Sequence, residues 1–243
     1  MATIDRPIAL VVGAGDHLGS AIARRFAREG FHIVATRRRG DLDTLVSDVR
    51  GLGSDATAMY SDARDEEQVI GLVEKVEAEL GPIAVTVFNV GGNVRFSITE
   101  TSTRVYRKVW EMCALAGFLL GREVAKKMLI RNQGTILFTG ASASVKGSSG
   151  FAAFAGGKHA LRALAQSMAR ELGPQGIHVA HVIVDGLIEN ESTAAVLPDL
   201  YASKGEDGII QPDDLAEVYW QLHNQPRTAW TFEQDIRPFA EPW

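Results

Sequence analysis

The stretch VVGAGDHLGSAIARRFAREG, residues 11–30, joins an apolar run to a helical pattern through a short turn. The run at 8–12 predicts a buried strand, and the apolar spacing at 17–29 predicts an amphipathic helix. Three glycines are spaced along the turn, at Gly13, Gly15 and Gly19. Glycines there allow tight turning and a close backbone approach, while the first helical amides face a bound phosphate. The stretch predicts a strand–turn–helix unit that holds the pyrophosphate of a dinucleotide; the alternative is a plain turn.

Strand and helix patterns alternate along the rest of the chain. Further β-rich runs occur at 31–36, 56–60, 83–89, 135–139 and 177–184, with helical patterns at 41–52, 65–80, 100–131 and 151–172. Because the strands are apolar almost throughout, both faces of a parallel sheet are expected to be covered by helices. The sequence predicts an α/β, doubly wound parallel sheet, a Rossmann fold of about seven strands, with ligands at the carboxyl ends of the strands. A last strand is expected within 227–243.

Composition fits one soluble α/β domain over residues 1–243, without repeats. Hydrophobic residues make up 46% of the chain, charged residues 23%, and the net charge is −5. Nucleic acids and anionic membranes need a clustered positive field, so a small-molecule partner is expected. The single cysteine and the lack of a targeting or membrane-spanning stretch favour the cytoplasm. The glycine-rich, charged segment at about 187–210 is a candidate substrate loop, with a surface insertion as the alternative.

The second predicted strand is followed by TRRRGD, residues 36–41. At this position a free ribose hydroxyl usually meets a carboxylate, whereas a 2′-phosphate meets arginine. Arg37, Arg38 and Arg39 therefore favour NADP(H) over NAD(H); the alternative is a solvated basic turn. Asp62, after the third predicted strand, is a candidate acceptor for the adenine amino group.

These motifs together resemble the short-chain dehydrogenase/reductase family, over residues 8 to about 190. The resemblance is carried by GAGDHLG (13–19), FNVGG (88–92), GTILFTGAS (134–142), FAAFAGGKHALRALAQSMARELGPQGIHV (151–179) and VDGLI (184–188). It implies cofactor contacts by residues that follow the strands and by one residue of the helical pattern at 151–172. These are Gly13, Gly15, His17, Leu18, Gly19, Arg37, Arg38, Asp62, Asn89, Gly91, Gly186 and Ile188, and on the helix Lys158. His17 stands where the family has its middle glycine.

Lys158 lies on an apolar helical stripe, and its surroundings depart from the family. The resemblance implies that it binds the nicotinamide ribose and faces a cleft. The family's catalytic tyrosine is replaced by Phe154, its serine by Ala141, and its asparagine falls near Cys113. Lys158 is the only one of the four expected catalytic residues that remains.

Phenylalanine cannot donate a proton, so another donor is required if redox chemistry is retained. The catalytic candidates are Lys158 and Ser142, with a small polar loop as the alternative role for Ser142. Tyr201 and Asp185 are weaker candidates, for which packing and a turn are the favoured explanations. A metal site is not expected, because the histidines lack ligand spacing.

Two functions are compatible with these residues. The first is an NADP(H)-dependent oxidoreductase acting on a carbonyl or alcohol. The second is an NADP(H)-binding sensor, scaffold or regulatory protein that has lost redox chemistry. In the resembling family the helices corresponding to 100–131 and 151–172 pair across subunits, so a homodimer or homotetramer is expected.

Overall fold

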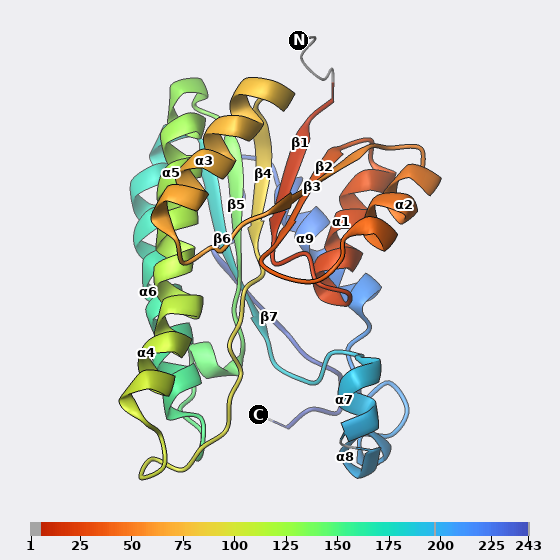
Figure 1. Ribbon diagram of the computed structural model, residues 1–243, viewed down its shortest axis with the longest axis vertical. Helices are drawn as coiled ribbons and strands as arrows, with labels where there is room; N and C mark the ends of the chain where they lie inside the picture. Colours follow the sequence, from red (N-terminus) through yellow and green to blue (C-terminus); the bar gives the residue numbers. More distant parts are fainter. Residues whose placement is uncertain (1–5, 197, 243) are drawn as a thin grey trace.

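The computed structural model describes residues 6–196 and 198–242; residues 1–5, 197 and 243 of the expected domain lie outside the described residues. Seven parallel strands form one sheet, in the order β3-β2-β1-β4-β5-β6-β7 (Figure 1). They are β1 (Ile8–Val12), β2 (His32–Arg37), β3 (Ala56–Tyr60), β4 (Ile83–Phe88), β5 (Gly134–Thr139), β6 (Ile177–Val184) and β7 (Glu233–Ile236). The predicted doubly wound sheet is confirmed, and the last strand lies where it was expected. The strand order reverses at β1, which places the switch point, and a ligand site, between β1 and β4.

Helices cover both faces of this sheet (Figure 1). One face carries α1 (Leu18–Arg28), α2 (Asp43–Gly51) and α9 (Pro212–His223). The other carries α3 (Glu66–Lys75), α4 (Thr103–Trp110), α5 (Ala116–Arg131) and α6 (Ala152–Leu172). Single helical turns also occur, at η1 (Val76–Leu80), η2 (Glu111–Leu115), η3 (Ser142–Ser144) and η4 (Gly173–Gln175).

Two of these helical regions differ from the sequence-based expectation. The helix expected at 100–131 begins at Thr103 and is interrupted by the π-helical turn η2, and such turns are frequent at functional sites. Helix α9 was not predicted, although it begins with proline and two aspartates, a favourable helix start. It packs along α1 and completes that face of the sheet.

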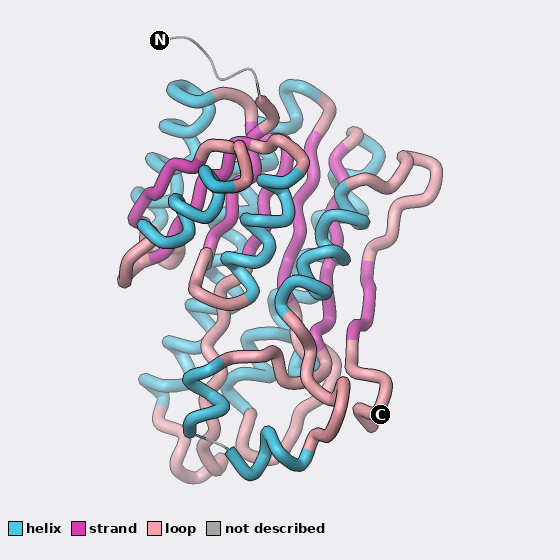
Figure 2. Tube along the Cα trace, turned by 90° about the vertical axis from the view of Figure 1, so that its right-hand side faces the viewer, coloured by secondary structure: helices cyan, strands magenta, loops and turns pink. Residues whose placement is uncertain are grey.

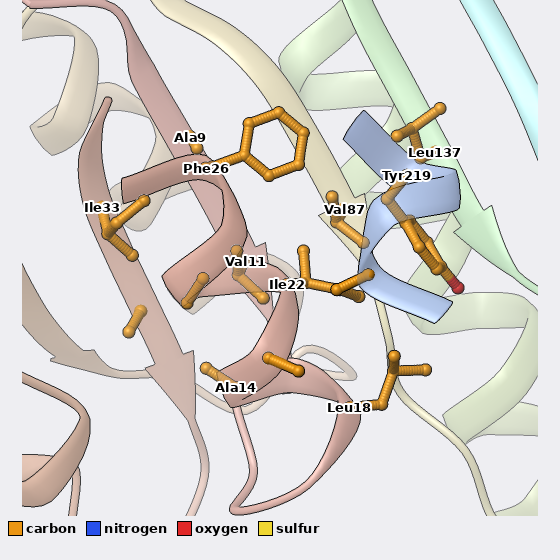
Figure 3. Close-up of a cluster of buried hydrophobic side chains, with 14 of the residues drawn as sticks. Ala9, Val11, Ala14, Leu18, Ile22, Phe26, Ile33, Val87, Leu137 and Tyr219 are labelled. Carbon is orange, nitrogen blue, oxygen red and sulfur yellow. The ribbon is translucent and has the colours of Figure 1, made fainter. Parts of the chain in front are cut away.

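A buried apolar cluster fixes α1 and α9 on the sheet (Figure 3). Phe26 of α1 is fully buried, and Ile22 points toward Val11 and Val87 of the strands. Tyr219 of α9 is also fully buried, and its hydroxyl forms a 2.7 Å hydrogen bond with Oγ1 of Thr139 at the end of β5. The cluster therefore holds the start of α1 rigidly beside the carboxyl ends of the central strands.

The segment expected as a substrate loop contains two short helices, α7 (Glu191–Val196) and α8 (Pro198–Ser203). They lie at the end of the molecule to which the central strands point, opposite the start of β1 (Figures 1 and 2). The Tyr201 hydroxyl accepts a 3.0 Å hydrogen bond from the amide of Asn190, and Lys204 pairs with Glu241 at 2.6 Å. These contacts tie the loop to itself and to the C-terminal segment, so Tyr201 is a packing residue in this conformation.

Candidate functional site

The glycine turn after β1 is built by close backbone contacts. The amides of Gly13 and Ala14 both donate to the carbonyl of Thr36 at 2.9 Å. Gly13 has a φ of +88°, and a Cβ on it would lie 2.6 Å from the carbonyl oxygen of Asn89. A Cβ on Gly19 would lie 2.3 Å from the oxygen of Gly13. Both positions therefore require glycine, and Gly19 serves the packing of α1 against the turn.

The remaining residues of the turn differ in whether their backbone or their side chain is open to a ligand. Around Gly15, a Cβ would meet no atom within 4 Å, so this backbone borders open space. Leu18 buries its side chain in the core, and His17 precedes α1 without a side-chain cap. Any cofactor contact of Leu18 therefore comes from its backbone. The side-chain amide of Asn89 donates to the carbonyl of Gly13 at 3.1 Å and braces the turn.

A cleft of about 320 Å³ opens beside this turn, at the ends of β1, β2, β3 and β4. Its lining includes Gly13, Gly15, Thr36, Arg37, Arg38, Arg39, Ser61, Asp62, Arg64, Asn89, Val90, Gly91 and Met112. The hydroxyls of Thr36 and Ser61 are buried and have no hydrogen-bond partner among the described residues. Because buried hydroxyls are normally paired, two unpaired ones in one cleft fit a polar ligand such as a dinucleotide.

Three arginines after β2 give one side of the cleft its charge. Arg37 pairs with Asp16 at 2.9 Å and also donates to the carbonyl of Asp41. The Arg38 side chain is 44% exposed and lies 3.7 Å from a carboxylate oxygen of Asp62. Arg39 lines the cleft and makes no ion pair within the described part of the chain. Arg38 and Arg39 are thus the more available cations for a phosphate.

Asp62 is engaged by Arg64. The Nε and Nη2 of Arg64 donate to the two carboxylate oxygens of Asp62 at 2.9 and 2.6 Å. The Arg64 hydrogen bonds lower the pKa of the Asp62 carboxyl to about 2, against the opposing effect of burial. This carboxylate is therefore ionised and occupied in the structure.

Lys158 is buried, with 3% of its surface exposed. Its Nζ donates to the carbonyl of Thr139 at 2.7 Å and lies 3.4 Å from that of Val90. Burial lowers the pKa of the ammonium group, opposed by the charge interaction with Cys113. Lys158 is not among the lining residues of this cleft, but Val90, whose carbonyl its Nζ approaches, is one of them. The expectation that Lys158 binds the nicotinamide ribose stays a prediction. Lys158 lies between the residues that follow β4 and the end of β5.

Phe154 lies one helical turn before this lysine, with its ring centre 5.9 Å from the Lys158 Nζ. It packs against an apolar cluster that includes Val109, Cys113 and Ala153. Cys113 lies in η2 and is fully buried, and burial raises the pKa of its thiol. The helix stripe therefore places a buried thiol and a phenyl ring beside the ammonium group.

Two serines follow β5, and their hydroxyl groups differ in accessibility. The buried Ser144 hydroxyl accepts a 3.1 Å hydrogen bond from the amide of Ala141. Ser142 is partly exposed at the start of η3. Ser142 is therefore the more accessible hydroxyl of the two.

The predicted residues after β6 lie outside the lining of the cleft. A Cβ on Gly186 would lie 2.7 Å from Cδ of Pro238, and Ile188 pairs with Ile210 in a parallel bridge. The Asp185 carboxylate pairs with Arg237 at 3.3 Å, so it serves as an ion-pair partner in this turn. The structure brings these residues together with the C-terminal segment.

Thr36, Ser61, Arg64 and Met112 line the cleft but were not predicted as site residues. Thr36, Ser61 and Arg64 lie at, or just after, the ends of β2 and β3, so the strand-end rule could have identified them. Met112 belongs to η2, which the helix pattern did not reveal.

No group of three His, Cys, Asp or Glu side chains among the described residues could hold a metal ion. None of the helices in that part of the chain has the length and apolarity of a membrane span.

A parallel seven-stranded sheet with a glycine turn and a cleft at its switch point defines a nucleotide-binding domain of the Rossmann type. The sequence profile of the short chain dehydrogenase family matches residues 7–201. The chain therefore belongs to this family of oxidoreductases.

Individual relatives agree with this assignment. A short-chain dehydrogenase/reductase of Armillaria gallica is 31% identical over 176 residues, 71% of this chain and 67% of the relative. The crystal structure of a short-chain dehydrogenase from Rhodopseudomonas palustris is 47% identical, covers 96% of this chain and 99% of its own, and has a TM-score of 0.84. A point variant of actinorhodin polyketide ketoreductase, crystallised with NADPH, is 25% identical and covers 100% of both chains, with a TM-score of 0.90.

Proposed function

We propose that the protein is an NADP(H)-dependent oxidoreductase of the short-chain type acting on a carbonyl or alcohol substrate. The observation that carries the cofactor choice is the charge of the cleft. Four arginines line it, and the aspartates that pair with them are Asp16 and Asp62, which leaves two positive charges in excess. A 2′-phosphate matches this excess, whereas a free ribose hydroxyl does not.

In this proposal each part of the cofactor has its own residues. The backbone of the glycine turn and the start of α1, with Gly13, Gly15, His17, Leu18 and Gly19, holds the pyrophosphate. Arg38 and Arg39, with Arg37 beside them, hold the 2′-phosphate. Asn89 and Gly91 border the adenosine side, and Lys158 with the backbone of Gly186 and Ile188 serves the nicotinamide end. When bound, the nicotinamide supplies hydride transfer, and this chain supplies position and a proton.

Two polar groups near the end of β5 are assigned roles at the substrate oxygen. Ser142 is a partly exposed hydroxyl there, suited to orient a carbonyl oxygen. The Lys158 ammonium has a lowered pKa because it is buried, which makes it a stronger acid than lysine in water. We assign Ser142 to positioning of the substrate oxygen and Lys158 to charge stabilisation. The segment at 187–210 is the candidate substrate loop above them.

Cofactor choice is tested by titrating the protein with NADPH and NADH and following the quenching of protein fluorescence. NADPH is expected to bind at least about tenfold more tightly, since one charge-assisted contact contributes about 1.5–3 kcal/mol. Arg38→Met is expected to remove most of this difference by weakening NADPH alone. Arg50→Met, on an exposed face of α2 outside the cleft lining, is the matched control. Equal affinities of the wild-type protein for both cofactors would contradict the proposal.

Redox activity is tested by following NADPH oxidation with aldehydes, ketones, quinones and activated alkenes. Turnover of at least one carbonyl class is expected. Tight NADPH binding without any turnover would favour the second function, a nucleotide-binding sensor, scaffold or regulatory protein. The resemblance supports that outcome, because Phe154 and Ala141 stand where the family has its catalytic tyrosine and serine.

We further propose that the protein assembles as a homodimer or homotetramer through the long helices. Tyr106, Trp110 and Phe118 recur at helical spacing along α4 and α5 and are 44%, 41% and 41% exposed. Aromatic side chains on one face are typical of subunit interfaces. Trp110→Glu is expected to convert the oligomer to a monomer in size-exclusion chromatography with light scattering, with Ile130→Glu as the exposed apolar control. A wild-type protein that is monomeric would contradict this proposal.

A further inference from the structure

A second cavity, of about 480 Å³, lies at the opposite end of the sheet from the cofactor cleft. Its lining includes Pro7, Pro82, Gly134 and Gly176, which lie at or just before the first residues of β1, β4, β5 and β6. It therefore opens at the end of the sheet where β1 begins (Figure 1). A cavity of this volume can hold a small organic molecule. Because the two linings share no residue, a ligand in the second cavity would leave the cofactor cleft free.

One wall of the second cavity is flat and aromatic. The rings of Trp230 and His178 are stacked, with their centres 4.9 Å apart and an angle of 3° between their planes. Nε1 of Trp230 donates to the carbonyl of Gln225 at 3.1 Å, and the His178 ring forms a 2.9 Å hydrogen bond with the carbonyl of Thr231. Phe31, just before β2, adds a further apolar surface to the lining. These contacts hold both stacked rings in place, so the wall suits a planar aromatic group.

The charge of the lining is positive. Arg131 and Arg227 belong to it, and among the described residues no aspartate or glutamate does. Glu77 accepts two hydrogen bonds from Arg131, at 2.7 and 3.0 Å, which balances that charge. Burial lowers the pKa of His223 to about 4 and also lowers that of His178, so both rings are neutral near pH 7. Arg227 makes no ion pair within the described part of the chain, and it leaves the lining with one positive charge that no carboxylate balances.

A glycine turn directs the Arg227 side chain. Gly176 has a φ of +84°, and a Cβ on it would lie 3.2 Å from Nη2 of Arg227 and 2.3 Å from the carbonyl oxygen of Asn132. Glycine is therefore required here, and it lets the guanidinium lie against the turn. Nη2 of Arg227 donates to the Asn132 carbonyl at 3.0 Å. Arg227 is exposed, and its remaining donors form no hydrogen bond with the described residues, so they are free to bind a carboxylate.

We propose that the second cavity binds a small planar aromatic carboxylate, with its ring against Trp230 and its carboxylate on Arg227. An aromatic wall beside a single unbalanced guanidinium favours such a monoanion over a neutral aromatic molecule, which would leave the cation unpaired. The inference goes beyond the proposed oxidoreductase function and does not depend on it, because the two sites have separate linings.

The ligand class is tested by isothermal titration calorimetry with two probes of the same shape, 2-naphthoate and the neutral 2-naphthamide. One 2-naphthoate is expected to bind per chain, at least about tenfold more tightly than 2-naphthamide, because only the carboxylate gains a charge-assisted contact. Its affinity is expected to be the same with and without NADPH. Equal affinity for the two probes, no binding of 2-naphthoate, or competition by NADPH would each overturn the inference. A protein that binds 2-naphthoate but neither NADPH nor NADH would contradict the proposed function and leave this inference intact.

Substitutions in the lining test where the probe binds. Arg227→Met is expected to weaken 2-naphthoate by about tenfold and to leave 2-naphthamide unchanged. Arg170→Met is the matched control, because Arg170 is also exposed and donates to a backbone carbonyl, but lies outside the lining. Trp230→Leu is expected to weaken both probes by about fivefold, since both lose the same ring contact. Thermal unfolding verifies that each variant is folded. Wild-type affinity for 2-naphthoate in a folded Arg227→Met variant would place the probe elsewhere and overturn the inference.

Discussion

Phe154→Tyr combined with Ala141→Ser is expected to raise kcat/KM for NADPH-dependent carbonyl reduction by about 10²–10⁴-fold, the usual contribution of a positioned general acid. The phenyl ring already lies 5.9 Å from the Lys158 Nζ, so a phenol at 154 would share its surroundings with the ammonium group. A nearby positive charge stabilises the phenolate and lowers the pKa of the phenol. The measurement is the rate of NADPH oxidation with the carbonyl panel, compared with wild type.

The control for this gain is a phenol elsewhere on the same helix start. Phe151→Tyr adds one at the residue before α6, nearly a full turn from Phe154, and is expected to leave the rate unchanged. NADPH affinity should stay constant in both variants, since none of these positions lines the cofactor cleft. A double variant no faster than wild type would contradict the prediction that a phenol at residue 154 can act as the general acid. It would indicate that the native protein already uses a proton donor of equal effect.

The fold was predictable from sequence because its determinants are local. The strands at 8–12, 56–60 and 177–184 begin and end at the predicted residues, since a buried parallel strand is one continuous apolar run. Gly13 and Gly19 were likewise predictable, because their spacing follows from the turn itself. Helix α9 was missed because it follows an irregular segment, and its apolar face depends on packing against α1.

The site was less predictable, because its side chains are arranged by contacts between elements. The Asp62–Arg64 pair is close in sequence, yet a pattern of residue types does not reveal that the arginine occupies both oxygens. Lys158 was identified by its unusual place on an apolar stripe. The direction of its ammonium group, however, depends on the carbonyl of Val90, after β4, and on that of Thr139, at the end of β5. Sequence thus located the charged residues, and only the structure shows which of them are already paired.

Lys158→Met is expected to weaken NADPH binding by about 10–100-fold, while the free energy of unfolding changes by less than about 2 kcal/mol. Two effects on the fold oppose each other. Removing the ammonium ends the cost of burying a charge, but it leaves the Thr139 carbonyl without the 2.7 Å hydrogen bond. Cofactor binding has no such compensation, because methionine cannot donate to a ribose hydroxyl. Fluorescence titration and denaturant unfolding measure the two quantities on the same variant.

The ammonium group of Lys158 must move before it can bind a ribose hydroxyl of the cofactor. Its Nζ points to the carbonyls of Thr139 and Val90, and of these two residues only Val90 belongs to the lining of the cleft. A ribose hydroxyl can be reached only if the long side chain changes rotamer away from the Thr139 carbonyl, and the flexible four-carbon stem of lysine permits this. Lys158→Arg keeps the charge but brings a wider head group into the buried surroundings of Phe154 and Cys113. It is expected to bind NADPH as weakly as Lys158→Met. Wild-type affinity in both variants would show that Lys158 serves only the packing of α6 against the strand ends.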